Sequence, residues 1–150
     1  MKITTDIIKA LREKTGVSVM QCKKALEEAG GDSKEAEIIL KKHSVAVAKK
    51  KSERTLSSGI VGSYVHDGDI GAMVILSCET DFVAKHPEFG ALARALSMQI
   101  AAMDPKNEED LLEQPSIKDE SRTVHDLLNE ATQKFGERIE ISRFARLSVR

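Results

Sequence analysis

The segment most informative about the architecture is Gly59–Cys78, GIVGSYVHDGDIGAMVILSC. It holds two β-rich runs, Gly59–Val65 and Ile70–Cys78, separated by the turn-forming residues His66–Asp69. This pattern predicts a β-hairpin. Both faces of the second run carry apolar side chains: Ile70, Ala72, Val74 and Leu76 on one face, Met73 and Ile75 on the other. We therefore expect the second strand to be central in a small antiparallel sheet.

The chain after the hairpin predicts two helices and a closing strand. Pro87 suits the first turn of a helix, whose apolar stripe recurs at spacings of about three to four residues: Phe89, Leu92, Leu96, Ile100 and Met103. A second helix follows Thr123, with these side chains inside: Val124, Leu127, Leu128, Ala131 and Phe135. Asp104–Pro115 is expected to be a polar link, and residues 139–149 alternate as in a strand. Residues 55–150 thus predict a β-β-α-α-β core of the α+β class.

The N-terminal segment, residues 1–54, reads as three short helices followed by a basic linker. The start signals are, in chain order, Thr4 or Thr5, the capping-box pair Ser18 and Gln21, and Asp32. Gly16 and the pair Gly30-Gly31 supply the helix ends. The apolar side chains of this segment are mostly small, so its hydrophobic core buries little apolar surface. We interpret it as a docking module rather than a source of stability.

Composition limits the class of protein. The 150 residues carry a net charge of −1, but residues 1–54 hold 13 basic and 8 acidic side chains, and residues 55–104 hold 2 and 6. This gradient favours two modules with a boundary near residues 50–57. No apolar run is long enough to span a membrane, and the N-terminus does not resemble a signal peptide. Two distant cysteines, Cys22 and Cys78, indicate neither a disulfide scaffold nor a zinc site, so we expect a cytoplasmic protein.

No catalytic arrangement is visible in the sequence. The four histidines are far apart, and there is no glycine-rich phosphate-binding motif. Cys78 and His86 are a conceivable nucleophile and base, but a buried structural cysteine is the more common outcome. The sequence therefore predicts a protein that is not an enzyme and that needs no metal and no cofactor.

Two segments are candidates for binding. Lys49–Lys51 with Arg54 form a basic patch suited to a phosphate backbone, although cations also suit the end of a helix. Glu79–Ala84 lies where the strand gives way to a helix, with Thr80 as a possible cap. Phe82 could extend the stripe of Phe89 if the helix were unbroken, but Pro87 argues against that. Periodicity leaves a buried and a protruding Phe82 evenly balanced.

Glu79–Ala84, ETDFVA, resembles the hallmark segment of the elongation factor Ts family, the nucleotide exchange factors of elongation factor Tu. Further segments resemble that family in order along the chain: Leu11–Gly16, Met20, Cys22–Leu26, Ala48–Lys51 with Gly59–Val61, Gly136–Ile139 and Arg143-Phe144. The resemblance implies that the N-terminal helices are a ubiquitin-associated-like module. Val19 and Gln21 depart from it, because the family usually has Met and Asp there.

The resemblance also implies a function. As a guanine nucleotide exchange factor in translation elongation, the chain would bind elongation factor Tu and release GDP by disturbing its magnesium and phosphate site. Its implied exchange residues are Thr80, Asp81, Phe82 and Val83, and its implied docking residues are Arg12, Val19 and Met20. Neither a membrane nor a nucleic acid is expected as a partner.

The short link and the lack of a second core subdomain resemble the compact forms of the family, which act as homodimers in a 2:2 complex. Residues 55–150 are thus the predicted dimerisation domain, with strand 139–149 as an edge that can pair with a second copy. Two alternatives remain: a nucleic-acid-binding adaptor that uses the basic N-terminal segment, and a scaffold without exchange activity.

Overall fold

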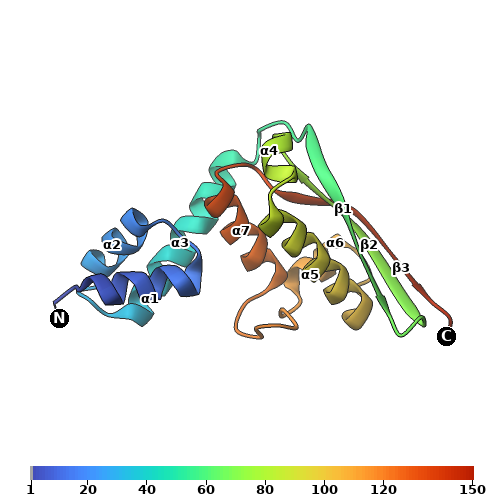
Figure 1. Cartoon of the computed structure of the whole chain (residues 1–150), viewed down its shortest axis with the longest axis horizontal. Helices are drawn as coiled ribbons and strands as arrows, with labels where there is room; N and C mark the ends of the chain where they lie inside the picture. Colours follow the sequence, from blue (N-terminus) through green and yellow to red (C-terminus); the bar gives the residue numbers. More distant parts are fainter. Residues whose placement is uncertain (1) are drawn as a thin grey trace. The chain divides into compact units, whose positions relative to one another are not determined.

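The computed structural model describes residues 2–150 (Figure 1). These residues form seven helices and three strands, in the order α1 Thr5–Thr15, α2 Val19–Glu28, α3 Ser33–Lys51, β1 Ser58–His66, β2 Ile70–Cys78, α4 Asp81–Ala84, α5 Pro87–Met103, α6 Glu108–Glu113, α7 Val124–Phe135 and β3 Glu140–Ser148. The predicted α+β class, with helices ahead of a small antiparallel sheet, is confirmed. No helix of the described chain is long and apolar enough to cross a membrane.

The described chain divides into two units. Unit 1 contains the residues up to Ser52 together with Asn129–Gly136, and unit 2 contains Glu53–Leu128 together with Glu137–Arg150. The second half of α7 thus groups with the N-terminal helices, a grouping between distant segments that no local pattern indicates. The predicted domain ranges, 1–54 and 55–150, remain a prediction.

Helices α1 to α3 of unit 1 begin where the capping residues lie. Thr4 accepts a hydrogen bond from the Ile7 N–H, Ser18 from that of Gln21, and Asp32 from those of Lys34 and Glu35. The three helices bury a small apolar cluster: Leu11, Val17, Cys22, Ala25, Leu26, Ala36 and Leu40. Helix α3 continues to Lys51, so the lysines expected in a linker form its last turn.

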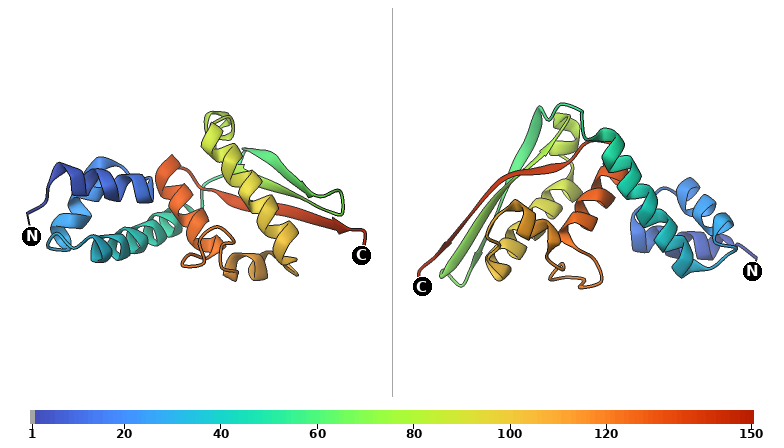
Figure 2. Two further views of the ribbon diagram at one scale, coloured as in Figure 1. Left: turned by 60° about the horizontal axis from the view of Figure 1, so that its bottom comes forward. Right: turned by 180° about the vertical axis from the view of Figure 1, so that it is seen from behind.

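The sheet of unit 2 has the strand order β1-β2-β3, and both pairs are antiparallel. The hairpin pairs Ser58 with Cys78 and His66 with Ile70, so the predicted turn and the central position of β2 are confirmed. Helix α5 lies across one face of the sheet, as the views in Figures 1 and 2 agree. Its predicted stripe is buried at Phe89, Leu96 and Ile100, whereas Met103 at its end is exposed.

Strand β3 contains an irregularity that changes which side chains face the helices. Ile75 pairs with Arg143 but Leu76 pairs with Ile141, so Ser142 is an extra residue in β3. The predicted single alternation over 139–149 is therefore wrong: Ile139 and Ile141 are buried, but after the bulge Leu147 is exposed. The even-numbered Phe144 becomes half-buried instead.

The predicted link between the two long helices is not wholly irregular. Helix α6, Glu108–Glu113, interrupts Asp104–Pro115, and Asn107 caps it by accepting from the Asp110 N–H. Leu111 of α6 is fully buried. One apolar side chain in an acidic segment therefore ties the link to unit 2, which the low hydrophobicity of the segment did not indicate.

Candidate partner-binding site

Helix α4 and its cap carry the four predicted exchange residues directly after the central strand β2. The helix consists of Asp81–Ala84 only, with Thr80 as its cap, and the chain then passes through Lys85 to His86, which caps α5. Pro87 occupies the first turn of α5, as predicted. The break before Pro87 separates Phe82 from the buried stripe of α5, because the two helices do not continue each other.

The side chain of Phe82 is exposed over 85% of its surface, the largest such fraction among the large exposed hydrophobic residues of the described chain. Asp81 beside it is also exposed, and its carboxylate lies 3.6 Å from the Lys85 ammonium. Val83 is half-buried and Ala84 is buried, so the same short helix is anchored on one side and open on the other. Periodicity alone did not distinguish a buried from a protruding Phe82. The structure shows that Phe82 protrudes.

Thr80 is the cap that the sequence predicts. Its hydroxyl oxygen accepts a hydrogen bond from the Val83 N–H at 3.5 Å. Its backbone carbonyl accepts from the Ala84 N–H at 3.2 Å and also lies 3.2 Å from the Cys78 thiol. These contacts define the first turn of α4, on which Asp81 and Phe82 stand.

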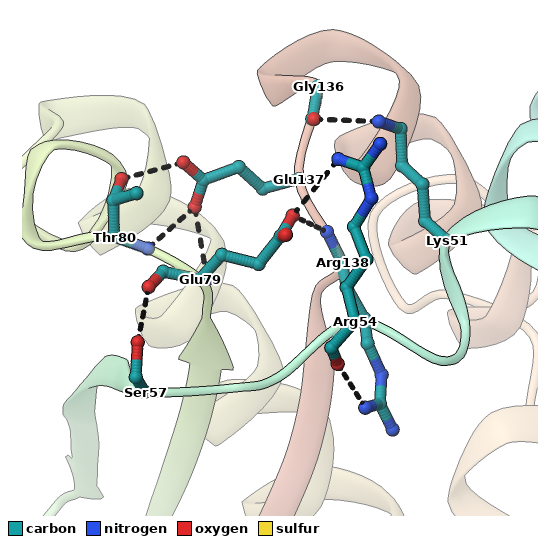
Figure 3. Close-up of polar contacts among 8 residues, drawn as sticks. All are labelled: Lys51, Arg54, Ser57, Glu79, Thr80, Gly136, Glu137 and Arg138. Atoms are coloured by element: carbon teal, nitrogen blue, oxygen red, sulfur yellow. Dashed lines mark hydrogen bonds and ion pairs between the residues drawn. The ribbon is translucent and has the colours of Figure 1, made fainter.

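Two glutamates, Glu79 and Glu137, join the end of β2 to the start of β3 (Figure 3). One carboxylate oxygen of Glu137 accepts from the N–H groups of Glu79 and Thr80 at 3.0 and 2.9 Å, and the other accepts from the Thr80 hydroxyl at 2.6 Å. In return, the Glu79 carboxylate accepts from the Arg138 N–H at 2.7 Å. Hydrogen bonds to ionised groups are stronger than those between neutral groups. These reciprocal hydrogen bonds therefore hold the end of β2 firmly against the segment that leads into β3.

The basic stretch is largely occupied by contacts within each unit. In unit 2 the Arg54 guanidinium lies 3.7 Å from the Glu79 carboxylate, and the Arg54 carbonyl accepts from the Arg138 side chain. In unit 1 the Lys51 ammonium donates to the Gly136 carbonyl at 2.9 Å. Lys49–Lys51 form the last turn of α3, the position that cations favour at a helix end. These roles support the structural interpretation of the basic residues.

The predicted docking residues lie in unit 1. Arg12 is on α1, and Val19 and Met20 form the first turn of α2, just after the Ser18 cap. All three are exposed, Met20 over 71% of its surface. Val17 and Cys22 on either side are buried, so α2 presents Met20 outward while its opposite face holds the core. The docking and exchange residues thus belong to different units.

Cys78 and His86 have structural contacts. Burial raises the pKa of the Cys78 thiol, and the negative charge of Glu137 adds to this shift. The ring nitrogen Nδ1 of His86 accepts from the Glu88 N–H at 3.1 Å, which caps α5. A thiol with a raised pKa is a poor nucleophile. Among residues 2–150, no group of three or more His, Cys, Asp or Glu side chains is placed to hold a metal ion.

The sequence did not indicate Glu137 as part of this site. It lies 57 residues after Thr80, beyond four helices, and no local pattern connects them. The only available signal was the resemblance of Gly136–Ile139 to a family segment, which assigned no contact to the glutamate. Pairing between the ends of β2 and β3 brings these residues together.

Comparisons with a family model and with known proteins point to the same family. The family model described as Elongation factor TS matches residues 79–150. The chain is 38% identical over 193 residues to elongation factor Ts of Thermodesulfovibrio yellowstonii, covering 99% of this chain and 97% of that protein. It is 39% identical over 191 residues to that of Methylacidiphilum infernorum, covering 98% and 95%.

A longer relative matches as well. Elongation factor Ts of Clostridium kluyveri is 44% identical over 148 residues, which are 98% of this chain but 48% of that protein. The aligned spans with the first two relatives exceed the 150 residues of this chain, so those proteins contain segments that it lacks. With such identity over almost the whole chain, the chain belongs to the elongation factor Ts family.

Proposed function

We propose that the chain is a guanine nucleotide exchange factor of translation elongation that binds elongation factor Tu in the cytoplasm and accelerates the release of GDP. The observation that carries the proposal is Phe82, an aromatic side chain exposed over 85% of its surface on a helix anchored at Thr80. A large apolar side chain held away from its own core is suited to insertion into a partner.

The proposed mechanism breaks no covalent bond. Asp81 and Phe82 would press between helices of the partner near its magnesium and phosphate site and weaken its contacts with GDP. Exchange of this kind is a negative coupling between two ligands, and the coupling must be reciprocal: GDP weakens the binding of the factor as much as the factor weakens that of GDP.

The magnitude of the effect requires more than one side chain. Each tenfold weakening of GDP binding requires about 1.4 kcal/mol, and burying one Phe side chain supplies roughly 1.5–3 kcal/mol. Phe82 therefore accounts for about two powers of ten at most. Docking through Arg12, Val19 and Met20 of unit 1 is proposed to supply the remaining binding free energy.

Release of fluorescent GDP from elongation factor Tu tests this function. We expect wild-type protein to accelerate release, and Phe82→Ala to lose most of the acceleration at saturating concentration while its thermal midpoint stays unchanged. Ile117→Ala is the matched control, because it also truncates an exposed apolar side chain. A wild-type chain without acceleration, or a Phe82→Ala variant at full rate, would refute the proposal.

We further propose that two copies of the chain form a homodimer through the sheet of unit 2. This dimer would bind two molecules of elongation factor Tu in a 2:2 complex. Within unit 2, α5 covers one face of the sheet (Figure 2), and the opposite face carries exposed apolar side chains: Val61, Val65, Met73, Ile75 and Leu147. These residues share a face because Val61 pairs with Ile75, and Gly71 pairs with both Val65 and Leu147. An exposed apolar patch of this kind favours association, and it includes part of the strand predicted as the dimer edge.

A further inference from the structure

We propose that Glu137 is a positioning residue for exchange: its carboxylate holds the start of α4 so that Asp81 and Phe82 are presented in one orientation. The inference rests on the proposed function and adds a residue to it that acts through Thr80. It follows from the contacts of Glu137 in unit 2 (Figure 3).

The Glu137 carboxylate binds three donors at the entrance to α4. Its Oε1 accepts from the backbone N–H groups of Glu79 and Thr80 at 3.0 and 2.9 Å, and its Oε2 accepts from the Thr80 hydroxyl at 2.6 Å. The two N–H groups come from consecutive residues, so one carboxylate fixes the direction of the chain as it leaves β2. A neutral side chain would make weaker bonds here.

The contact to the Thr80 hydroxyl determines how the cap works. A hydroxyl has a single proton to donate and two lone pairs. The proton of Thr80 is directed to Glu137, which leaves a lone pair for the Val83 N–H at 3.5 Å. Glu137 thereby orients the cap, and the cap orients the turn that bears Phe82.

Glu137 is itself held in place by its neighbour. The Arg138 N–H donates to the Glu79 carboxylate at 2.7 Å, and the Arg138 side chain donates to Glu140 and to the Arg54 carbonyl. The last paired residues of β2 and β3 are Ser77 and Glu140. The carboxylate bonds therefore extend the connection between these two chain segments past the end of the ladder.

This anchor matters because α4 is very short. A helix of four residues, Asp81–Ala84, is unstable alone, so its order depends on contacts with the rest of unit 2. Its last residue, Ala84, is buried in unit 2, and Glu137 secures its first turn. If the carboxylate is lost, Phe82 remains available but samples several orientations, and fewer encounters lead to release.

The test compares Glu137→Ala, Glu137→Gln and the control Glu113→Ala in the GDP-release assay with elongation factor Tu. Glu113 is an exposed glutamate at the end of α6 in the same unit, outside the hydrogen bonds that join β2, β3 and α4. We expect Glu137→Ala to lower the maximal release rate about tenfold, with the half-saturating concentration within about twofold of wild type. Glu137→Gln should give a rate between those of Glu137→Ala and wild type, because its amide oxygen can accept from both N–H groups but its amide nitrogen cannot accept the Thr80 proton. Glu113→Ala should match wild type.

Two further measurements distinguish positioning from general stability. In a Phe82→Ala background, Glu137→Ala should cause no additional loss of rate, because residues acting as a unit are non-additive. Amide hydrogen exchange, measured without the partner, should be about tenfold faster at Thr80 and Val83 in Glu137→Ala and unchanged in α5.

An unchanged maximal rate, additive losses, or unchanged amide exchange at Thr80 and Val83 would overturn the inference. The proposed function fails separately, if wild-type protein does not accelerate release at all. Amide exchange reports on the role of Glu137 in either case.

Discussion

Gly62 of β1 lies against Ala93 of α5 so closely that a Cβ atom on residue 62 would be 2.6 Å from the Ala93 carbonyl oxygen and 2.8 Å from its Cβ. Both residues are buried. This close approach brings the helix onto the sheet from which α4 emerges. The spacing between helix and sheet therefore depends on a residue without a side chain.

We expect Gly62→Ala to lower the free energy of unfolding by about 1–3 kcal/mol, because the added methyl group forces the helix backbone away from the sheet. Urea unfolding followed by circular dichroism measures the change. Gly90→Ala is the matched control: it lies in α5, and outside the neighbouring backbone of that helix no atom is within 4 Å of an added Cβ. Replacing a helical glycine should stabilise by up to about 1 kcal/mol. Equal stability of Gly62→Ala and wild type would contradict the close approach.

Met20→Ala should weaken docking to elongation factor Tu without changing the maximal rate of GDP release. Only the minority of interface residues that carry most of the binding free energy cost over about 1 kcal/mol when truncated. If Met20 is one of them, as its proposed docking role requires, the half-saturating concentration in the GDP-release assay should rise about five- to tenfold. The maximal rate should stay at the wild-type value, in contrast to Phe82→Ala. Met103→Ala, exposed at the end of α5 in unit 2, is the control. A lower maximal rate for Met20→Ala would show that the two groups of residues do not have separate roles.

Met73→Glu should convert the proposed dimer into monomers. Met73 is 54% exposed and pairs with Ser63 and Ala145 on the open face of the sheet. The substitution therefore costs little in a monomer but buries two carboxylates in each dimer, one from each copy. Size-exclusion chromatography with light scattering gives the mass directly. Met103→Glu, away from this face, should leave the mass unchanged. A wild-type chain that is monomeric at high concentration would refute the sheet-face dimer.

Asp32 should make unit 1 sensitive to acid. Hydrogen bonds from the Glu35 and Lys34 N–H groups lower the pKa of its carboxyl. Because the folded pKa is below the unfolded one, the stabilisation is complete above about pH 4 and is lost as the pH falls through the folded pKa. The thermal midpoint of Asp32→Asn should lie below that of wild type near pH 7, and the gap should narrow below about pH 4. A gap independent of pH would contradict this role of the carboxylate.

Local pattern was sufficient for most elements. Thr4, Ser18, Asp32 and Thr80 cap helices as expected, because a side-chain cap depends on residues only two or three positions apart. The hairpin was equally predictable, since its turn is contiguous with both strands. The hallmark segment containing Asp81 and Phe82 could also be recognised from sequence, and Pro87 correctly indicated the break after it.

Contacts between distant segments were not predictable. The bulge at Ser142 reverses which residues of β3 face α5, and nothing in the strand itself marks it, because a bulge arises from the pairing with β2. Periodicity did not determine whether Phe82 is buried or exposed. Phe82 is exposed because α4 is anchored on its own unit through other residues. Glu137 reaches Thr80 only because β2 and β3 end side by side. Short-range chemistry thus determines where helices and turns form, whereas long-range pairing determines which side chains remain exposed for a partner.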